Sequence, residues 1–148
     1  MKTRIFLAML VTIATFGTKT NAQTKALNMQ KTVLLLNAHL TYSGLSEGKL
    51  NNAFYEKAKD FFLSQNFKVL ETKIESGYNV EEEVEKQMQA DIIVLQTPVN
   101  WENTPWIYKK YVDDVFTNAM KSQKFLSGDG RSATDTTKEY GTGGKMQG

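Results

Sequence analysis

Along the chain, short apolar runs alternate with longer segments whose apolar residues recur at helical spacing. Residues 32–37 (TVLLLN) and 91–96 (DIIVLQ) are runs of the kind that form buried parallel strands. Residues 67–73 (FKVLETK) form a third, more polar run, which is typical of a strand near the edge of a sheet. The pattern therefore predicts three β-strands.

Three helices are predicted, one after each strand. Ser46 is the candidate N-cap of the first helix, and Asn79 caps the second, whose first turn holds acidic residues 81–83, the sign that the helix dipole favours there. Thr104 is the candidate cap of the third helix, with Pro105 in the first turn, where no N–H is needed. The apolar positions of the first helix are Leu50, Phe54, Ala58, Phe61 and Phe62, and those of the third are Ile107, Tyr111, Val112, Val115 and Phe116.

This order of elements predicts an α/β fold, with a doubly wound parallel sheet covered on both faces in a three-layer α/β/α arrangement. In such sheets, ligands bind beyond the carboxyl ends of the strands. The loops at residues 38–48 and 97–103 lie at that edge. Residues 98–106 hold two tryptophans and two prolines. This segment is either a well-packed corner between strand and helix or a surface for a flat ligand.

The first 22 residues have the layout of a secretory signal peptide. Lys2 and Arg4 precede an apolar core at residues 5–16, which is too short to span a bilayer comfortably, and small residues precede a cleavage site before Gln23. An uncleaved anchor is the alternative. We expect export, most simply to the periplasm, with no membrane span after cleavage; a leader that does not function would leave the protein in the cytoplasm. Residues 23–30 are a short linker, and residues 31–148 form one domain.

Charge and composition exclude several functions. Without the leader, the chain has 15 basic and 16 acidic residues, so nothing indicates a nucleic-acid partner. The absence of cysteine excludes thiolate chemistry, and the single histidine, His39, disfavours a histidine-rich metal site. Asp113 and Asp114 are adjacent on a predicted helix and point in different directions, so we interpret them as a solvated face and predict no metal site. No GxGxxG motif follows the first strand, which disfavours a Rossmann dehydrogenase.

Two ordered sets of motifs carry a family resemblance. The first is Gln96-x-Pro98-x-x-Trp101-x-x-x-Pro105-Trp106, continued by KKYVDDVF at residues 109–116. The second is SGDGR at residues 127–131, followed by the glycine-rich segment at residues 138–148. The chain resembles the flavodoxin-like NAD(P)H:quinone oxidoreductases, most closely the modulator of drug activity B group, over residues 31–148.

The resemblance implies a flavin, FAD first with FMN as the alternative, and two-electron reduction of a quinone by hydride that NAD(P)H delivers to the flavin. It also implies a homodimer. Two other functions stay open: a flavodoxin-type electron carrier without NAD(P)H-driven turnover, and a truncated, non-catalytic protein without flavin. Relatives carry fourth and fifth strands, so we expect a share of the cofactor site to lie outside these 148 residues, and the third strand to be left as an apolar edge.

The cofactor residues implied fall on the two carboxyl-edge loops. Free N–H groups and the dipole at the start of the first helix favour a phosphate there. Lys49 is either a phosphate contact or a solvated lysine, and His39 is either a phosphate contact or a loop residue without a role. Trp101 is expected to pack against the flavin ring, and Tyr140 to donate a hydrogen bond at the cofactor or acceptor. The implied cofactor-binding residues are His39, Ser46, Glu47, Gly48, Lys49, Leu50, Asn51, Asn52, Val99, Asn100, Trp101, Glu102 and Tyr140.

A departure from the family lies in the second loop. Relatives carry a bulky apolar residue and a glycine where this chain has Glu102 and Asn103. Asparagine tolerates positive φ better than most residues, so Asn103 is expected to take the glycine's place.

Overall fold

A computed structural model describes residues 30–146, so the predicted leader lies outside the described residues. Within this range the elements are β1 (Thr32–Asn37), α2 (Lys49–Ser64), β2 (Lys68–Lys73), the 3₁₀-helix η1 (Ile74–Ser76), α3 (Val80–Gln89), β3 (Ile92–Gln96) and α4 (Trp106–Lys121). All three predicted strands and all three predicted helices are present. No helix between residues 30 and 146 is long and apolar enough to cross a membrane.

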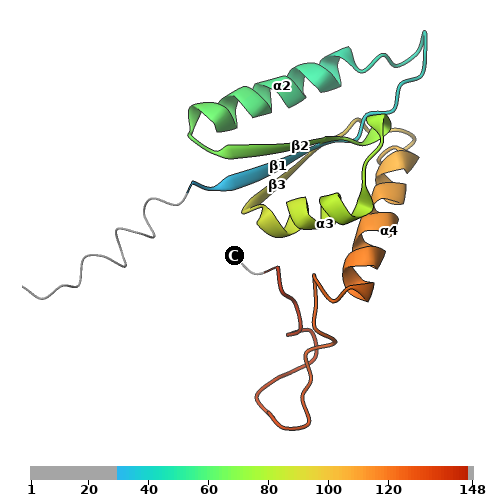
Figure 1. The fold of residues 1–148 in the computed structure, drawn as a ribbon. Helices are drawn as coiled ribbons and strands as arrows, with labels where there is room; N and C mark the ends of the chain where they lie inside the picture. Colours follow the sequence, from blue (N-terminus) through green and yellow to red (C-terminus); the bar gives the residue numbers. More distant parts are fainter. Residues whose placement is uncertain (1–29, 147–148) are drawn as a thin grey trace, which may run out of the picture.

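The three strands form one parallel sheet in the order β2-β1-β3. Leu35 of β1 is paired with Glu71 of β2 on one side and with Val94 of β3 on the other. The polar strand β2 lies at an edge, as its sequence predicts. Helix α2 covers one face of the sheet, and α3 and α4 cover the other (Figure 1). The predicted three-layer α/β/α arrangement is therefore confirmed.

Two hydrophobic clusters hold the layers together, because side chains of a strand alternate between its faces. Val33 and Leu35 of β1 pack with Tyr55 on the α2 side. Leu34 and Leu36 point to the other side, where the core contains residues of α3 and α4. Since all six residues of β1 are buried, this strand is the centre of the domain and fixes the position of its carboxyl end.

The predicted apolar face of α2 is wrong for three of its five residues, whereas Phe62 packs against the cluster of Val33, Leu35 and Tyr55. Leu50, Phe54 and Phe61 are 71%, 57% and 58% exposed, whereas Asn51 and Tyr55 are buried. The helix directs Tyr55 toward β1 and β2. Phe54 and Phe61 instead line a groove of about 710 Å³, whose lining also includes Gln96 at the end of β3. Helical spacing identified a real apolar stripe, but not the element that it faces.

A smaller error affects α4. Ile107, Tyr111 and Val115 are buried as predicted, whereas Phe116 is 41% exposed and Ala119 takes its place in the core.

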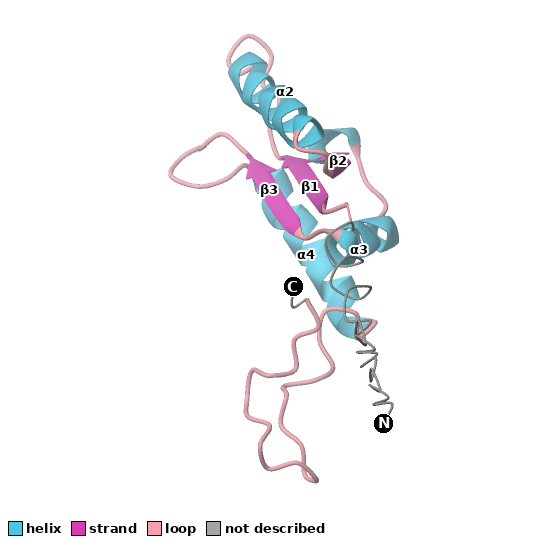
Figure 2. Cartoon of the chain, turned by 90° about the vertical axis from the view of Figure 1, so that its left-hand side faces the viewer, coloured by secondary structure: helices cyan, strands magenta, loops and turns pink. Residues whose placement is uncertain are grey.

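Among the described residues, no strand lies beyond β3 (Figure 2), so β3 is the open apolar edge that the sequence predicts.

Only one of the three predicted caps is confirmed. The Asn79 side chain accepts a hydrogen bond from the Glu82 backbone N–H at 3.0 Å. Ser46 does not cap α2, because a turn with Tyr42 places it before the helix, which begins after Gly48. Thr104 does not cap α4 either: Pro105 occupies the N-cap position, without a side-chain hydrogen bond.

Candidate functional site

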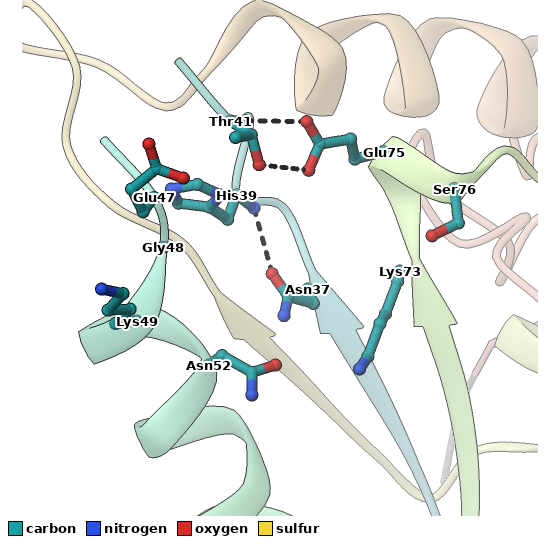
Figure 3. Close-up of a pocket in the computed structure, with 10 residues that line it drawn as sticks. All are labelled: Asn37, His39, Thr41, Glu47, Gly48, Lys49, Asn52, Lys73, Glu75 and Ser76. Carbon is teal, nitrogen blue, oxygen red and sulfur yellow. Dashed lines mark hydrogen bonds between the residues drawn. The ribbon is translucent and has the colours of Figure 1, made fainter. Parts of the chain in front are cut away.

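A cavity of about 450 Å³ opens at the carboxyl ends of β1 and β2, beside the start of α2 (Figure 3). It lies at the edge of the sheet where the order of elements predicts that a ligand binds. Its lining consists of Asn37, His39, Thr41, Glu47, Gly48, Lys49, Asn52, Lys73, Glu75 and Ser76. Five of these, His39, Glu47, Gly48, Lys49 and Asn52, are residues for which the family resemblance implies cofactor binding.

Gly48 and His39 form the turn that leads into α2. Gly48 has φ 70°, in the left-handed region, and a Cβ atom there would lie only 2.6 Å from His39 Cε1. The His39 ring is buried, and its Nε2 lies 3.2 Å from Ser46 Oγ. His39 and Ser46 thus support the loop from inside, and glycine is required at position 48 both by conformation and by space.

Buried amide side chains join three elements beneath this loop. Asn37 Oδ1 accepts hydrogen bonds from the His39 backbone N–H at 3.1 Å and from Asn51 Nδ2 at 2.9 Å. Asn51 Oδ1 in turn accepts from Gln96 Nε2 at 3.1 Å. Because buried polar groups are costly unless paired, this row of hydrogen bonds fixes β1, α2 and β3 relative to one another. Asn51 therefore acts from beneath the loop and does not line the cavity.

The start of α2 presents an anion-binding arrangement. No side chain caps this helix, and its first turn contains no acidic residue. The unpaired first-turn N–H groups and the helix dipole favour a negative charge, and the Lys49 and Asn52 side chains line the same cavity. Leu50, the other residue implied on this turn, is exposed and outside the lining.

The far wall of the cavity comes from the end of β2 and from η1, which the sequence does not single out. The Glu75 carboxylate accepts hydrogen bonds from the Thr41 backbone N–H at 2.7 Å and from Thr41 Oγ1 at 3.0 Å. It thereby ties the β1–α2 loop to η1. The one available signal is topological, since adjacent parallel strands end at the same edge. Lys73, the last residue of β2, lies on this wall.

The loop after β3 ends in a strained turn. Asn100 and Asn103 exchange two backbone hydrogen bonds, of 2.7 and 3.0 Å. Between them, Trp101 and Glu102 have φ of 47° and 70°. The prediction that Asn103 takes the positive φ is therefore wrong. Left-handed backbone costs roughly 1–2 kcal/mol per non-glycine residue. Trp101 is 99% exposed, which excludes the interpretation of a well-packed corner. This loop lies at the same sheet edge but does not line the cavity.

A second cavity, of about 480 Å³, lies on the other face of the sheet, between the starts of α3 and α4. Trp106 lines it and is 62% exposed, so this tryptophan is a wall residue and not core. Asp114, also in the lining, accepts a 2.7 Å hydrogen bond from the Tyr78 hydroxyl and pairs with Lys110. The hydrogen bond from Lys110, with that from Tyr78, lowers the pKa of Asp114.

The adjacent Asp113 pairs with Lys109 on the exposed surface. The two aspartates thus have separate partners. Asp113 lies on the solvated face that the sequence predicts, whereas Asp114 is partly buried and lines the second cavity. Within residues 30–146 no group of three His, Cys, Asp or Glu side chains is arranged to hold a metal ion.

Tyr140 lies apart from the other implied residues. It is 77% exposed, and the Arg131 guanidinium carbon is 5.8 Å from its ring centre. Its loop follows the C-terminal end of α4 and extends away from the carboxyl edge of the sheet (Figure 1). The structure does not bring Tyr140 to the cavity, and its role stays a prediction.

Comparisons with known proteins agree with this architecture. A family model described as a flavodoxin-like fold matches residues 31–148. The NADPH:quinone oxidoreductase MdaB of Haemophilus influenzae is 40% identical over 116 residues, which are 78% of this chain and 59% of the relative. An uncharacterised protein of Schizosaccharomyces pombe is 38% identical over 114 residues, which are 77% of this chain and 57% of the relative.

A solved structure of an NADPH-quinone reductase from P. pentosaceus has a TM-score of 0.42 and 26% sequence identity, and the match covers 68% of this chain and 51% of that one. The chain therefore spans less than two thirds of the length of each of these proteins.

Proposed function

The chain belongs to the flavodoxin-like fold family, and from this membership we propose that it binds a flavin nucleotide and acts as a flavin-dependent NAD(P)H:quinone oxidoreductase. The observation that carries the proposal is the cavity at the uncapped start of α2, floored by Gly48 and His39. The 40% identity to an NADPH:quinone oxidoreductase supports the reaction class.

The residues present fit the phosphate end of a flavin nucleotide. A phosphate beside Gly48 can accept hydrogen bonds from the first-turn N–H groups of α2, and Lys49 adds a positive charge. The His39 ring packs against Gly48 on the side where a Cβ atom would lie, so it supports the backbone that borders the cavity. The Asn52 amide supplies a further donor in the lining.

The loop after β3 would hold the flat ring system. Its two-residue turn presents Trp101 to solvent, and an indole in that position can pack face-on against an aromatic ligand. Val99, which is 76% exposed, adds apolar surface that can exclude water. A bound flavin supplies the two-electron transfer from NAD(P)H to the quinone; the protein supplies orientation and a dry surface.

Lys49→Gln tests the proposal, with Lys57→Gln as the matched control. Both lysines belong to α2, but Lys57 does not line the cavity. We expect the wild-type protein to quench flavin fluorescence in a saturable titration. Loss of one charge-assisted contact should weaken binding by about tenfold in Lys49→Gln and leave Lys57→Gln unchanged.

Equal effects of the two substitutions, or no saturable binding by the wild type, would contradict the proposed site. Oxidation of NAD(P)H with a quinone as acceptor is measured on the same samples. Flavin binding without this turnover would assign the protein to the flavodoxin-type electron carriers instead.

A further inference from the structure

The acidic side chains of the cavity are already engaged by the protein. Glu47 Oε1 accepts a 2.7 Å hydrogen bond from the Gly44 backbone N–H. Both oxygens of Glu75 accept hydrogen bonds from Thr41, at 2.7 and 3.0 Å. The two lysines of the lining, Lys49 and Lys73, come from different walls of the cavity. The lining thus has two separate positive charges, whereas its negative charges are directed to the β1–α2 loop.

Lys73 extends from the end of β2 toward α2. Its Nζ lies 5.5 Å from the centre of the Tyr55 ring and 3.7 Å from Glu56 Oε1. The second distance exceeds that of a hydrogen bond, so Glu56 attracts the ammonium group without using its donors. In Figure 3, Lys73 extends away from the β1–α2 loop, to the same end of the cavity as Asn52. Tyr55 and Glu56 therefore guide the side chain, while its N–H groups stay available to a ligand.

Lys73 and Asn52 lie at the side of the cavity opposite the β1–α2 loop (Figure 3). Asn52 is four residues beyond Gly48, which corresponds to a rise of about 6 Å along the helix. A single phosphate held at the first turn of α2 would engage Lys49 and leave Lys73 without a phosphate to bind. A ligand with two linked phosphates can engage both, since each lysine acts as a point charge for a phosphate.

We propose that Lys73 is a specificity-determining residue that binds the second phosphate of a diphosphate ligand, so that the cavity selects a dinucleotide flavin over a mononucleotide. This inference rests on the proposed function, because it assumes that the protein binds a flavin. Lys73 lies outside the loop and helix turn that the family resemblance singles out, and its charge would favour the flavin that carries two phosphates.

The test compares Lys73→Gln and Lys73→Arg with the control Lys57→Gln, in fluorescence titrations with FAD and FMN at low ionic strength. We expect the wild type to bind FAD more tightly than FMN. Lys73→Gln should lower the affinity for FAD by about tenfold and change the affinity for FMN by no more than about twofold. Lys73→Arg keeps the charge and should retain the preference. Melting temperatures of all variants are measured to separate binding from folding.

Equal weakening of FAD and FMN by Lys73→Gln, or unchanged FAD binding, would overturn the inference and leave the proposed function intact. A parallel arm uses pyrophosphate and inorganic phosphate as the probes, which removes the adenine from the comparison. Stronger thermal protection of the wild type by pyrophosphate than by phosphate, lost in Lys73→Gln, supports a diphosphate site at Lys73; a failure of both flavins to bind would then count against the proposed function and not against this site. Equal protection by the two anions overturns it.

Discussion

Substitution of two glycines in one loop separates backbone strain from the close approach that shapes the site. Gly44 and Gly48 both have positive φ, 75° and 70°. A Cβ atom at position 44 would meet nothing within 4 Å, whereas at position 48 it would lie 2.6 Å from the His39 ring. Gly44→Ala therefore introduces strain alone, and Gly48→Ala introduces the same strain and displaces a buried ring.

The magnitudes follow from these contacts. Left-handed backbone costs roughly 1–2 kcal/mol for alanine, which is the full effect expected for Gly44→Ala. In Gly48→Ala the His39 ring must move, which also breaks its contact with Ser46 and adds about 1–2 kcal/mol. Urea unfolding followed by circular dichroism measures the free energies of unfolding, and flavin titration measures the site. We expect Gly48→Ala to be the less stable variant and to bind flavin weakly, and Gly44→Ala to retain binding. Equal stabilities and equal flavin affinities of the two variants would refute this reasoning.

Three further predictions concern other parts of the molecule. Trp101→Ala should reduce flavin retention more than Trp106→Ala at matched far-UV circular dichroism, because Trp101 lies on the loop proposed to hold the flavin ring, whereas Trp106 lines the second cavity; equal flavin contents would contradict this. Partial burial raises the pKa of Glu71, but hydrogen bonds from Lys59 and Tyr55 outweigh the effect of burial, so the pKa of Glu71 is lowered. The carboxylate therefore stabilises the fold above its ordinary pKa of about 4.5, and this contribution is lost as the pH falls below that value; Lys59→Gln should flatten the acid limb of a stability profile. We also propose that the N-terminal leader directs export, so N-terminal sequencing of secreted protein should begin at Gln23, and an intact leader on a cytoplasmic product would contradict this.

The strands and the sheet could be predicted closely, because a buried parallel strand has a strong local signature. The predicted residues 32–37 are those of β1, and the polarity of β2 places it correctly at the edge. The prediction of which face of α2 is buried was wrong for Leu50, Phe54 and Phe61, because periodicity identifies an apolar stripe and not the element that it packs against. Tyr55, and not Phe54, packs on the sheet.

The site was predictable only where it is local in sequence. The residues around Gly48 follow from the rule that parallel strands bind ligands at their carboxyl ends, and the structure brings several of them to one cavity. Lys73 and Glu75 come from another strand and a 3₁₀-helix, so no spacing along the chain connects them to this loop. The left-handed turn at Trp101 was also missed, since its residue types do not favour that conformation.

The most direct measurement is the visible absorbance of the flavin-loaded protein under anaerobic conditions, before and after NADPH is added. The proposed function predicts that NADPH abolishes the absorbance of the bound oxidised flavin and that a quinone restores it within the same sample. Lys49→Gln, loaded at the same total flavin, should show a smaller bound fraction and a smaller change than Lys57→Gln. Flavin that stays bound and oxidised after NADPH, or protein that retains no flavin, would contradict the proposed reaction.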